Sequence, residues 1–300
     1  MTTFRLKNKT LSLYYRIRGT GEPLLLIHGL GSSGADWEFQ VRALERRFRV
    51  IVPDLPGCGF SSAIEGEFGI ADFAQALWAL LSHLHISRTN IAGFSLGGAV
   101  ALEMALQRPD DVPRLALINT LVTYKIDNWR KWLEARVPPI LIGLLGMRGA
   151  ARLAAARLFP KPWQRPLRER AIEVIGRGVA ESYLAMGRAL ERWSAADRLS
   201  LLKSKILLMA AEHDFTPLAE KLEMAKALGA QFAVVHGSRH GTPFDAIEAT
   251  NVCLLSLFSD RSISQTRRWL CDAAPRSRRL ARIAGFVEEH TALHRLEVGF

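Results

Sequence analysis

A serine flanked by glycines is the residue of this chain whose setting most favours chemistry. Ser95 lies in Gly93-Phe94-Ser95-Leu96-Gly97, between a short apolar strand pattern and a helical pattern. This context predicts a sharp turn that projects the serine hydroxyl from the end of a strand, with glycines where the backbone passes close. Free N–H groups at the start of the next helix would lie beside the serine. We therefore expect Ser95 to be a nucleophile that attacks a carbonyl carbon.

A histidine is needed to accept the serine proton, because a hydroxyl is a poor nucleophile without a base. The chain has eight histidines. His240 lies in a glycine-bounded loop just after the last apolar strand pattern, which opens at the sheet edge expected for the serine. His236 lies at the end of that strand, where it would pack as a strand residue. His28 ends an early strand, and His83 and His85 end a helix. We assign the base to His240.

An acidic residue must orient the base and stabilise its protonated form. Asp214 follows the apolar strand pattern at 206–209, which places it at the carboxyl edge of a parallel sheet, where functional sites collect. Glu212 in the same loop is the local alternative, and Asp127 is a more distant one. Asp214 could instead cap the helix that follows it. We favour Asp214 as the acid.

The negative charge that develops on a carbonyl oxygen under attack needs preorganised N–H donors. The position directly after the nucleophile predicts the backbone N–H of Leu96 as one donor. The loop His28-Gly29-Leu30-Gly31 also follows a strand and offers the second donor. We expect this donor to be the backbone N–H of Leu30.

Strand and helix patterns alternate along most of the chain. Apolar strand patterns cover residues 11–17, 24–27, 49–52, 89–92, 115–118, 206–209 and 232–235. Helical spacing of apolar residues covers 35–46, 70–84, 96–107, 217–228 and 245–258. This alternation predicts an α/β fold with a mostly parallel central sheet and helices on both faces.

The alternation stops between residues 122 and 204, where prolines, arginines and helical patches occur without a strand pattern. We therefore predict a core made of residues 1–121 and 205–258. A helical insertion at 122–204 interrupts this core, and a basic C-terminal extension at 259–300 follows it.

Positive charge is concentrated outside the predicted core. The net charge is +11, and the insertion alone has sixteen basic and seven acidic residues, about +9. The extension adds eight basic and five acidic residues, about +3, so the core is near −1. Such patches are either solvated surface or attract an acidic protein or anionic lipid. No nucleic-acid-binding motif accompanies the arginines, so we expect no nucleic-acid partner.

The remaining composition narrows the class of protein. Three cysteines, Cys58, Cys253 and Cys271, argue against a disulfide framework. The N-terminus lacks an apolar signal region, and no run of about 18 uncharged apolar residues predicts a spanning helix. A cytoplasmic location is expected. No metal-ligand spacing or cofactor motif occurs, so we expect neither a metal nor a cofactor.

The motifs together resemble the α/β-hydrolase fold superfamily. The resemblance rests on the chain order Ser95, Asp214 and His240, on the loop at 28–31 and on Asp54-Leu-Pro-Gly-Cys-Gly-Phe-Ser61. It covers about residues 10–121 and 205–258. The resemblance implies that the insertion is a cap over the pocket and that Asp54 belongs to a structural loop.

The same resemblance separates this chain from some relatives. Serine at 95 differs from haloalkane dehalogenases and epoxide hydrolases, which have aspartate at that position. His28-Gly-Leu-Gly31 differs from the H-G-x-G-P-G loop of ring-fission C–C hydrolases.

Three functions follow from these residues. The first is hydrolysis of a small-molecule carboxylic ester or related acyl compound through an acyl-enzyme on Ser95. The second is a thioesterase or esterase whose acyl group is held by an acidic carrier protein on the basic cap. The third is a non-catalytic binding module on the same fold.

The cap and the extension offer further surfaces. Five cap aromatics either line an acyl pocket or pack the cap onto the core: Trp129, Trp132, Trp163, Tyr183 and Trp193. The apolar stretch around Leu141–Met147 is either a lid that touches lipid or a buried helix. The extension has basic and apolar residues between Arg276 and Val287 that predict a short amphipathic helix for an anionic membrane surface.

Overall fold

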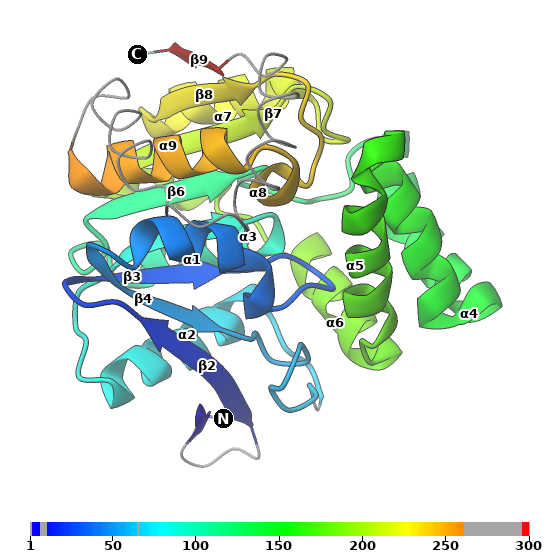
Figure 1. Cartoon of the computed structure of the whole chain (residues 1–300), viewed down its shortest axis with the longest axis horizontal. Helices are drawn as coiled ribbons and strands as arrows, with labels where there is room; N and C mark the ends of the chain where they lie inside the picture. The colour runs from blue at the N-terminus through cyan, green and yellow to red at the C-terminus, as the bar shows by residue number, and fades with distance from the viewer. Residues whose placement is uncertain (1, 7–10, 65, 261–295, 300) are drawn as a thin grey trace, which may run out of the picture.

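The computed structural model of the protein describes residues 2–6, 11–64, 66–260 and 296–299, the last of these as backbone (Figure 1). It has a single central sheet with helices on both sides and a separate group of helices at one edge. The α/β fold with a mostly parallel sheet, expected from the alternating patterns, is confirmed.

The nine strands of the sheet come from the whole length of the described chain. They are β1 (Thr2–Arg5), β2 (Ser12–Arg18), β3 (Glu22–Ile27), β4 (Phe48–Pro53), β5 (Asn90–Phe94), β6 (Arg114–Ile118), β7 (Lys205–Ala211), β8 (Gln231–Val235) and β9 (Leu296–Gly299). Their order across the sheet is β1-β2-β4-β3-β5-β6-β7-β8-β9. In the run β4-β3-β5-β6-β7-β8, each strand is parallel to the next. The pairs β1–β2, β2–β4 and β8–β9 are antiparallel.

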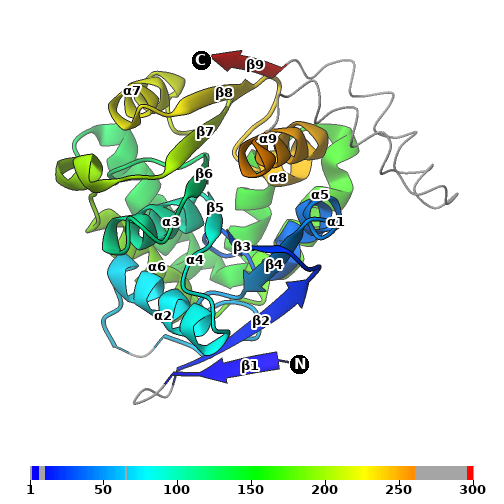
Figure 2. The same ribbon diagram turned by 90° about the vertical axis from the view of Figure 1, so that its left-hand side faces the viewer.

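Helices cover both faces of the sheet, so the central strands are apolar on both sides (Figure 2). The core helices are α1 (Glu38–Leu44), α2 (Ile70–His83), α3 (Leu96–Gln107), α7 (Leu218–Leu228), α8 (Thr242–Asp245) and α9 (Ile247–Ser259), with a short 3-10 helix, η1 (Gly34–Trp37), before α1. Leu25 and Ile27 of β3 face α2 and α3, whereas Leu24 and Leu26 face α1 and α9. This alternation explains why the strands read as continuous apolar runs.

The insertion is helical, as predicted. It consists of α4 (Trp129–Leu158), η2 (Pro162–Gln164), α5 (Arg165–Gly176), α6 (Ala180–Glu191) and η3 (Ala196–Leu201). It contains no strand, and its two ends meet at an isolated β-bridge between Thr123 and Ser194. The Ala195 N–H also donates to the Val122 carbonyl at 2.8 Å. The insertion therefore leaves and re-enters the core at one place.

The long element α4 folds back on itself. Gly146 has φ 66° and ψ 173°, which breaks the helix into two arms, 129–145 and 147–158. Arg157 of the second arm donates to Glu134 of the first at 3.0 Å. In a straight helix these residues would lie about 34 Å apart, so the two arms run side by side.

By length and composition, α4 is the one helix among the described residues that could cross a membrane. The sequence predicted no such helix, because it has no run of about 18 uncharged apolar residues; by length and composition α4 departs from that prediction. The two arms, of about 17 and 12 residues, are each shorter than the roughly 20 residues that span a bilayer. In this structure α4 is therefore no continuous span.

Two edge strands were not predicted. β1 pairs with β2, and β9 pairs with β8, so each adds an antiparallel edge to the sheet. The amphipathic helix predicted between Arg276 and Val287 lies outside the described residues.

Candidate active site

The turn at Ser95 has a strained backbone. Ser95 has φ 54° and ψ −119° between β5 and α3, and it is partly exposed. A Cβ on Gly93 would lie 2.2 Å from the Gly97 carbonyl oxygen, and one on Gly97 would lie 2.3 Å from the Ile27 oxygen. Only glycine fits at both positions, so the two glycines bring α3 against the ends of β3 and β5.

The structure places His240 next to Ser95. The His240 Nε2 lies 2.9 Å from the Ser95 Oγ, although the two residues are 145 positions apart. His240 follows β8 in the loop before α8, and Phe94 and Phe215 flank its ring at centroid distances of 5.3 and 4.1 Å. Its side chain is 10% exposed. The two rings fix the imidazole in a plane that reaches the serine.

Asp214 lies on the other side of the imidazole. Its Oδ1 is 2.8 Å from the His240 Nδ1 and accepts a hydrogen bond from the Phe215 N–H at 2.7 Å. Its Oδ2 accepts from the Thr216 hydroxyl at 2.9 Å and from the Lys221 ammonium. Both oxygens of this buried carboxylate are therefore saturated with donors.

Lys221 is a feature that the sequence did not reveal. Its side chain is fully buried, as is that of Asp214, and the two form an ion pair. Burial lowers the pKa of Lys221, and the Asp214 carboxylate offsets this only in part. For Asp214, burial would raise the pKa, but the charges and hydrogen bonds of His240 and Lys221 outweigh it and hold the pKa well below its usual range. Asp214 is thus a permanent anion near neutral pH.

Asn119 is a second residue that the sequence reasoning missed. It directly follows β6, has φ 49° and is buried. Its Nδ2 donates to the His240 carbonyl at 2.8 Å and to the Thr242 hydroxyl at 2.7 Å, while its Oδ1 accepts from the Ala211 N–H at 2.8 Å. One side chain thus ties the histidine loop to the end of β7. Its place after a strand was the available signal, since polar residues there lie at the site edge.

The alternative acids lie away from the histidine. Glu212 is partly exposed and accepts from the Gly237 N–H at 2.7 Å. Asp127 is exposed and pairs with Lys131 at 2.9 Å. Neither carboxylate is a hydrogen-bond partner of His240.

The other histidines have structural contacts. His236 faces Glu212 at 3.4 Å. The buried His28 accepts the Leu55 N–H at its Nε2, at 2.9 Å, and so connects the loops after β3 and β4. His83 stacks on Phe4 with ring centroids 4.7 Å apart, and His85 follows the end of α2. None of these histidines is a hydrogen-bond partner of Ser95.

The loop predicted to supply a second N–H donor passes beside Ser95. A Cβ on Gly29 would lie 3.3 Å from the Ser95 Cβ. Leu30 follows in this loop, and Leu96 begins α3 on the other side of the serine. Asp54 supports the same region, since its carboxylate accepts from the N–H groups of Gly34 and Phe60 at 2.7 and 2.8 Å.

The insertion covers the site from several directions. The Arg157 guanidinium lies over the Phe215 ring at 5.2 Å, and that ring contacts His240. Phe159 fills the space beside Gly241, and Tyr183 lies against Gly31 of the loop beside Ser95. The α4–α6 segment therefore lies beside the residues around the serine, and we call it the cap.

The cap aromatics divide between packing and exposure. Trp193 is buried and donates to Glu103 of α3 at 2.9 Å, so it packs the cap onto the core. Trp129, Trp132 and Trp163 are 68%, 51% and 41% exposed and do not form a buried acyl pocket. Among the five, Tyr183 contacts Gly31 of the loop beside Ser95.

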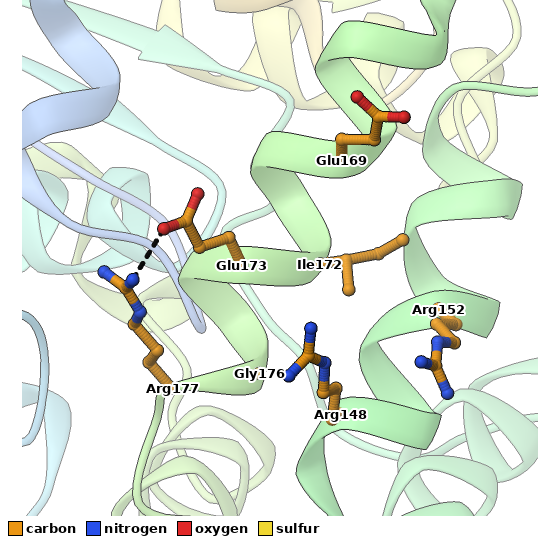
Figure 3. A pocket seen from close by; sticks show the side chains of 7 residues that line it. All are labelled: Arg148, Arg152, Glu169, Ile172, Glu173, Gly176 and Arg177. Atoms are coloured by element: carbon orange, nitrogen blue, oxygen red, sulfur yellow. Dashed lines mark ion pairs between the residues drawn. The ribbon is translucent and has the colours of Figure 1, made fainter.

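A pocket of about 470 Å³ lies within the cap and does not touch Ser95 (Figure 3). Residues of α4 and α5 and the residue after α5 line it: Arg148, Arg152, Glu169, Ile172, Glu173, Gly176 and Arg177. Glu173 pairs with Arg177 at 2.7 Å inside this pocket. Because Ser95 and His240 do not line it, we do not assign the reaction to this pocket.

Comparison with known proteins matches the alpha/beta hydrolase fold family over residues 22–246. The chain is an α/β hydrolase. A hydrolase from Pseudomonas aeruginosa has the same fold, with a TM-score of 0.76 and 24% identity over 86% of this chain and 97% of its own. At this identity the likeness shows the fold alone.

Two curated relatives of this α/β hydrolase match shorter segments. The magnesium-chelatase 30 kDa subunit of Rhodobacter capsulatus is 45% identical over 105 residues, 35% of this chain and 36% of its own. The pimeloyl-[acyl-carrier protein] methyl ester esterase of Vibrio cholerae is 42% identical over 123 residues, 40% of this chain and 46% of its own. The matches thus span less than half the length of either relative, so the particular substrate does not follow from them.

Proposed function

We propose that this hydrolase cleaves a carboxylic ester through an acyl-enzyme on Ser95, with His240 as the base and Asp214 as the residue that orients it. The observation that carries the proposal is the unbroken contact from Ser95 Oγ through both ring nitrogens of His240 to Asp214, at 2.9 and 2.8 Å. This arrangement activates a serine. The esterase relative supports the choice of an ester.

In the first half of the reaction the Ser95 Oγ bonds to the carbonyl carbon as its proton passes to the His240 Nε2. The carbon–oxygen bond to the leaving group then breaks, and the alcohol takes that proton. In the second half water attacks the acyl carbon and gives a proton to His240. The Ser95 oxygen leaves, recovers the proton, and the carboxylic acid departs.

The backbone N–H groups of Leu30 and Leu96 are the proposed donors for the oxyanion that forms in each half. The adjacency of the Gly29 loop and Ser95 supports this assignment. Fixed donors in a site shielded from water are worth about 10²–10³ in rate each.

The test is covalent labelling by a fluorophosphonate, mapped by mass spectrometry, in the wild type and in Ser95→Ala. Labelling of the wild type at Ser95, with none in the variant, is the expected result. A folded wild type that resists the probe would instead favour the non-catalytic binding module. His240→Ala is expected to lower kcat by about 10³ or more, and near-normal turnover would refute the assigned base.

A second candidate is an ester or thioester held by an acidic carrier protein. The cap is strongly basic, at about +9, and the esterase relative acts on a carrier-bound ester. Under this candidate, kcat/KM for the carrier-bound substrate falls steeply with salt while that for a free neutral ester does not. Equal salt dependence of the two substrates would remove it.

A further inference from the structure

The first arm of α4 has an apolar face that points away from the protein. Trp129, Leu133, Val137, Ile140 and Leu144 recur every three or four residues and share one side of the helix. Their exposed fractions are 68%, 40%, 39%, 57% and 76%. We call these five residues the α4 stripe. A surface helix normally turns such a stripe toward the core, so the usual polarity is reversed here.

The opposite side of the same arm is already occupied. Ile142 is buried, and Lys131 reaches Glu220 of α7 at 3.7 Å. Arg136, at the border of the stripe, pairs with Glu191 of α6 at 3.3 Å. The burial of Ile142 and the exposed fractions of the stripe show that the stripe points outward, and α4 itself lies on the outer side of the cap (Figure 1). The helix therefore already packs against the protein through its other side, and the stripe is a separate, outward apolar face.

A cation lies at one end of the stripe, and two more lie in the second arm of α4 that follows it. Arg130 is exposed and lies over the Trp129 ring at 5.6 Å. Beyond the turn at Gly146, Arg148 and Arg152 line the cap pocket (Figure 3). The two glutamates of that pocket pair with other arginines, Glu169 with Arg165 at 2.8 Å and Glu173 with Arg177 at 2.7 Å. Across residues 2–6, 11–64 and 66–260, no carboxylate pairs with Arg148 or Arg152.

We propose that the α4 stripe docks this protein onto an anionic phospholipid surface, with Arg130, Arg148 and Arg152 placed against the headgroup phosphates. An outward apolar face with tryptophan and a cation at one end and two further cations in the adjoining arm is suited to the lipid–water interface. An acidic protein surface would pair with the arginines, but it would not account for the outward exposure of the five apolar side chains. The arm lies in the plane of the interface, since it is too short to cross it and its other side is anchored to α7.

The test is co-sedimentation of the full-length protein with vesicles of phosphatidylcholine, with or without phosphatidylglycerol, at low and high salt. The wild type is expected to bind the phosphatidylglycerol vesicles at low salt. Ile140→Glu combined with Leu144→Glu is expected to lower the partition coefficient at least tenfold. Leu201→Glu combined with Leu222→Glu makes the same charge change at exposed leucines outside α4, and should retain binding. All variants should keep the far-ultraviolet circular dichroism of the wild type.

A second pair of variants separates the charges from the apolar face. Arg148→Gln with Arg152→Gln should weaken binding to phosphatidylglycerol vesicles and flatten its dependence on salt. The proposal is overturned if the wild type ignores anionic vesicles at low salt, or if the stripe variant binds as well as the control. It is also overturned if the wild type forms a dimer and does not bind vesicles, while the stripe variant is a monomer. The stripe would then join two copies of this chain.

Discussion

The ion pair between Lys221 and Asp214 decides how the histidine is held. A carboxylate buried beside an imidazole alone would be easier to protonate, because burial raises its pKa. Lys221 supplies a second positive charge that keeps the carboxylate ionised. Asp214 therefore contributes stability that is present above the ordinary aspartate pKa of about 3.9 and is lost as the pH falls toward its lower folded value.

Lys221→Met is expected to shift the acid side of the pH profile of kcat/KM to higher pH. Without the ammonium the pKa of Asp214 rises, so Asp214 takes up a proton, and loses its hold on His240, at a less acidic pH. The lost partner should also lower the free energy of unfolding by about 3 kcal/mol. Lys226→Met is the control, because Lys226 lies on the same helix, is exposed and pairs with Glu223. An unshifted profile in Lys221→Met would make Lys221 purely structural.

Asn119 combines a left-handed backbone with a full set of side-chain hydrogen bonds. Asn119→Ala and Asn119→Gly both leave the buried Ala211 N–H without its acceptor, at a cost of about 1–3 kcal/mol. Alanine also retains the strain of a positive φ, so we expect it to be less stable than glycine by about 1 kcal/mol. Denaturant unfolding measures both values. Equal stabilities would show that the backbone at this position is not strained.

Sequence patterns were sufficient to predict that Ser95, His240 and Asp214 lie together, and the structure brings them into contact. Ser95, His240 and Asp214 follow different strands, and parallel strands bring their carboxyl ends to one edge. Lys221 was beyond reach, because a lysine in an amphipathic helix ordinarily faces solvent and only the tertiary fold shows that this one is buried.

At the scale of the elements, the spacing of apolar residues predicts the core but not the arrangement of the cap. The core strands and helices were predictable because each buries a face against a neighbour next to it in the sheet. The α4 fold-back depends on a single glycine and on contacts between its arms. The stripe also misleads, since its spacing is that of a buried face and only the exposed fractions show that it points outward.

The buried contact between Trp193 and Glu103 holds the returning end of the cap to α3. Arg198 reaches the same carboxylate at 2.8 Å. Burial would raise the pKa of Glu103, but the hydrogen bonds from Arg198 and Trp193 outweigh it and leave the pKa lowered. The contact therefore stabilises the fold above the ordinary glutamate pKa of about 4.3, and this stabilisation is lost as the pH falls through the lower folded value.

Trp193→Phe removes the indole donor and should lower the free energy of unfolding by about 1–3 kcal/mol near neutral pH. The difference from the wild type should shrink in acid, where Glu103 becomes protonated. Trp129→Phe makes the same chemical change at an exposed residue and should stay within about 0.5 kcal/mol of the wild type. Thermal or denaturant unfolding at two pH values measures this, and equal effects of the two variants would contradict the anchoring role.

At the scale of the whole molecule, the two parts differ in charge. The core is near neutral and the cap carries about +9, so positive charge is concentrated in the segment that contacts the residues around Ser95. Such a field speeds the encounter with anions and is screened by salt.

We expect kcat/KM for an ester with a carboxylate in its acyl chain to fall as ionic strength rises. The value for a neutral ester of the same length should change little. Stopped-flow or steady-state rates over a salt series measure the two slopes. Parallel slopes would mean that the cap charge does not reach the path of the substrate.

The meeting of the two cap ends has a consequence for how such proteins diversify. Thr123 and Ser194 form one β-bridge, so the segment between them leaves and re-enters the core at one place, while the sheet stays continuous because β6 pairs directly with β7. A segment with adjoining ends can be exchanged for another without moving the strands on either side. Grafting a different helical segment between these positions would therefore change what can reach Ser95, while the sheet and the residues around Ser95 stay in place.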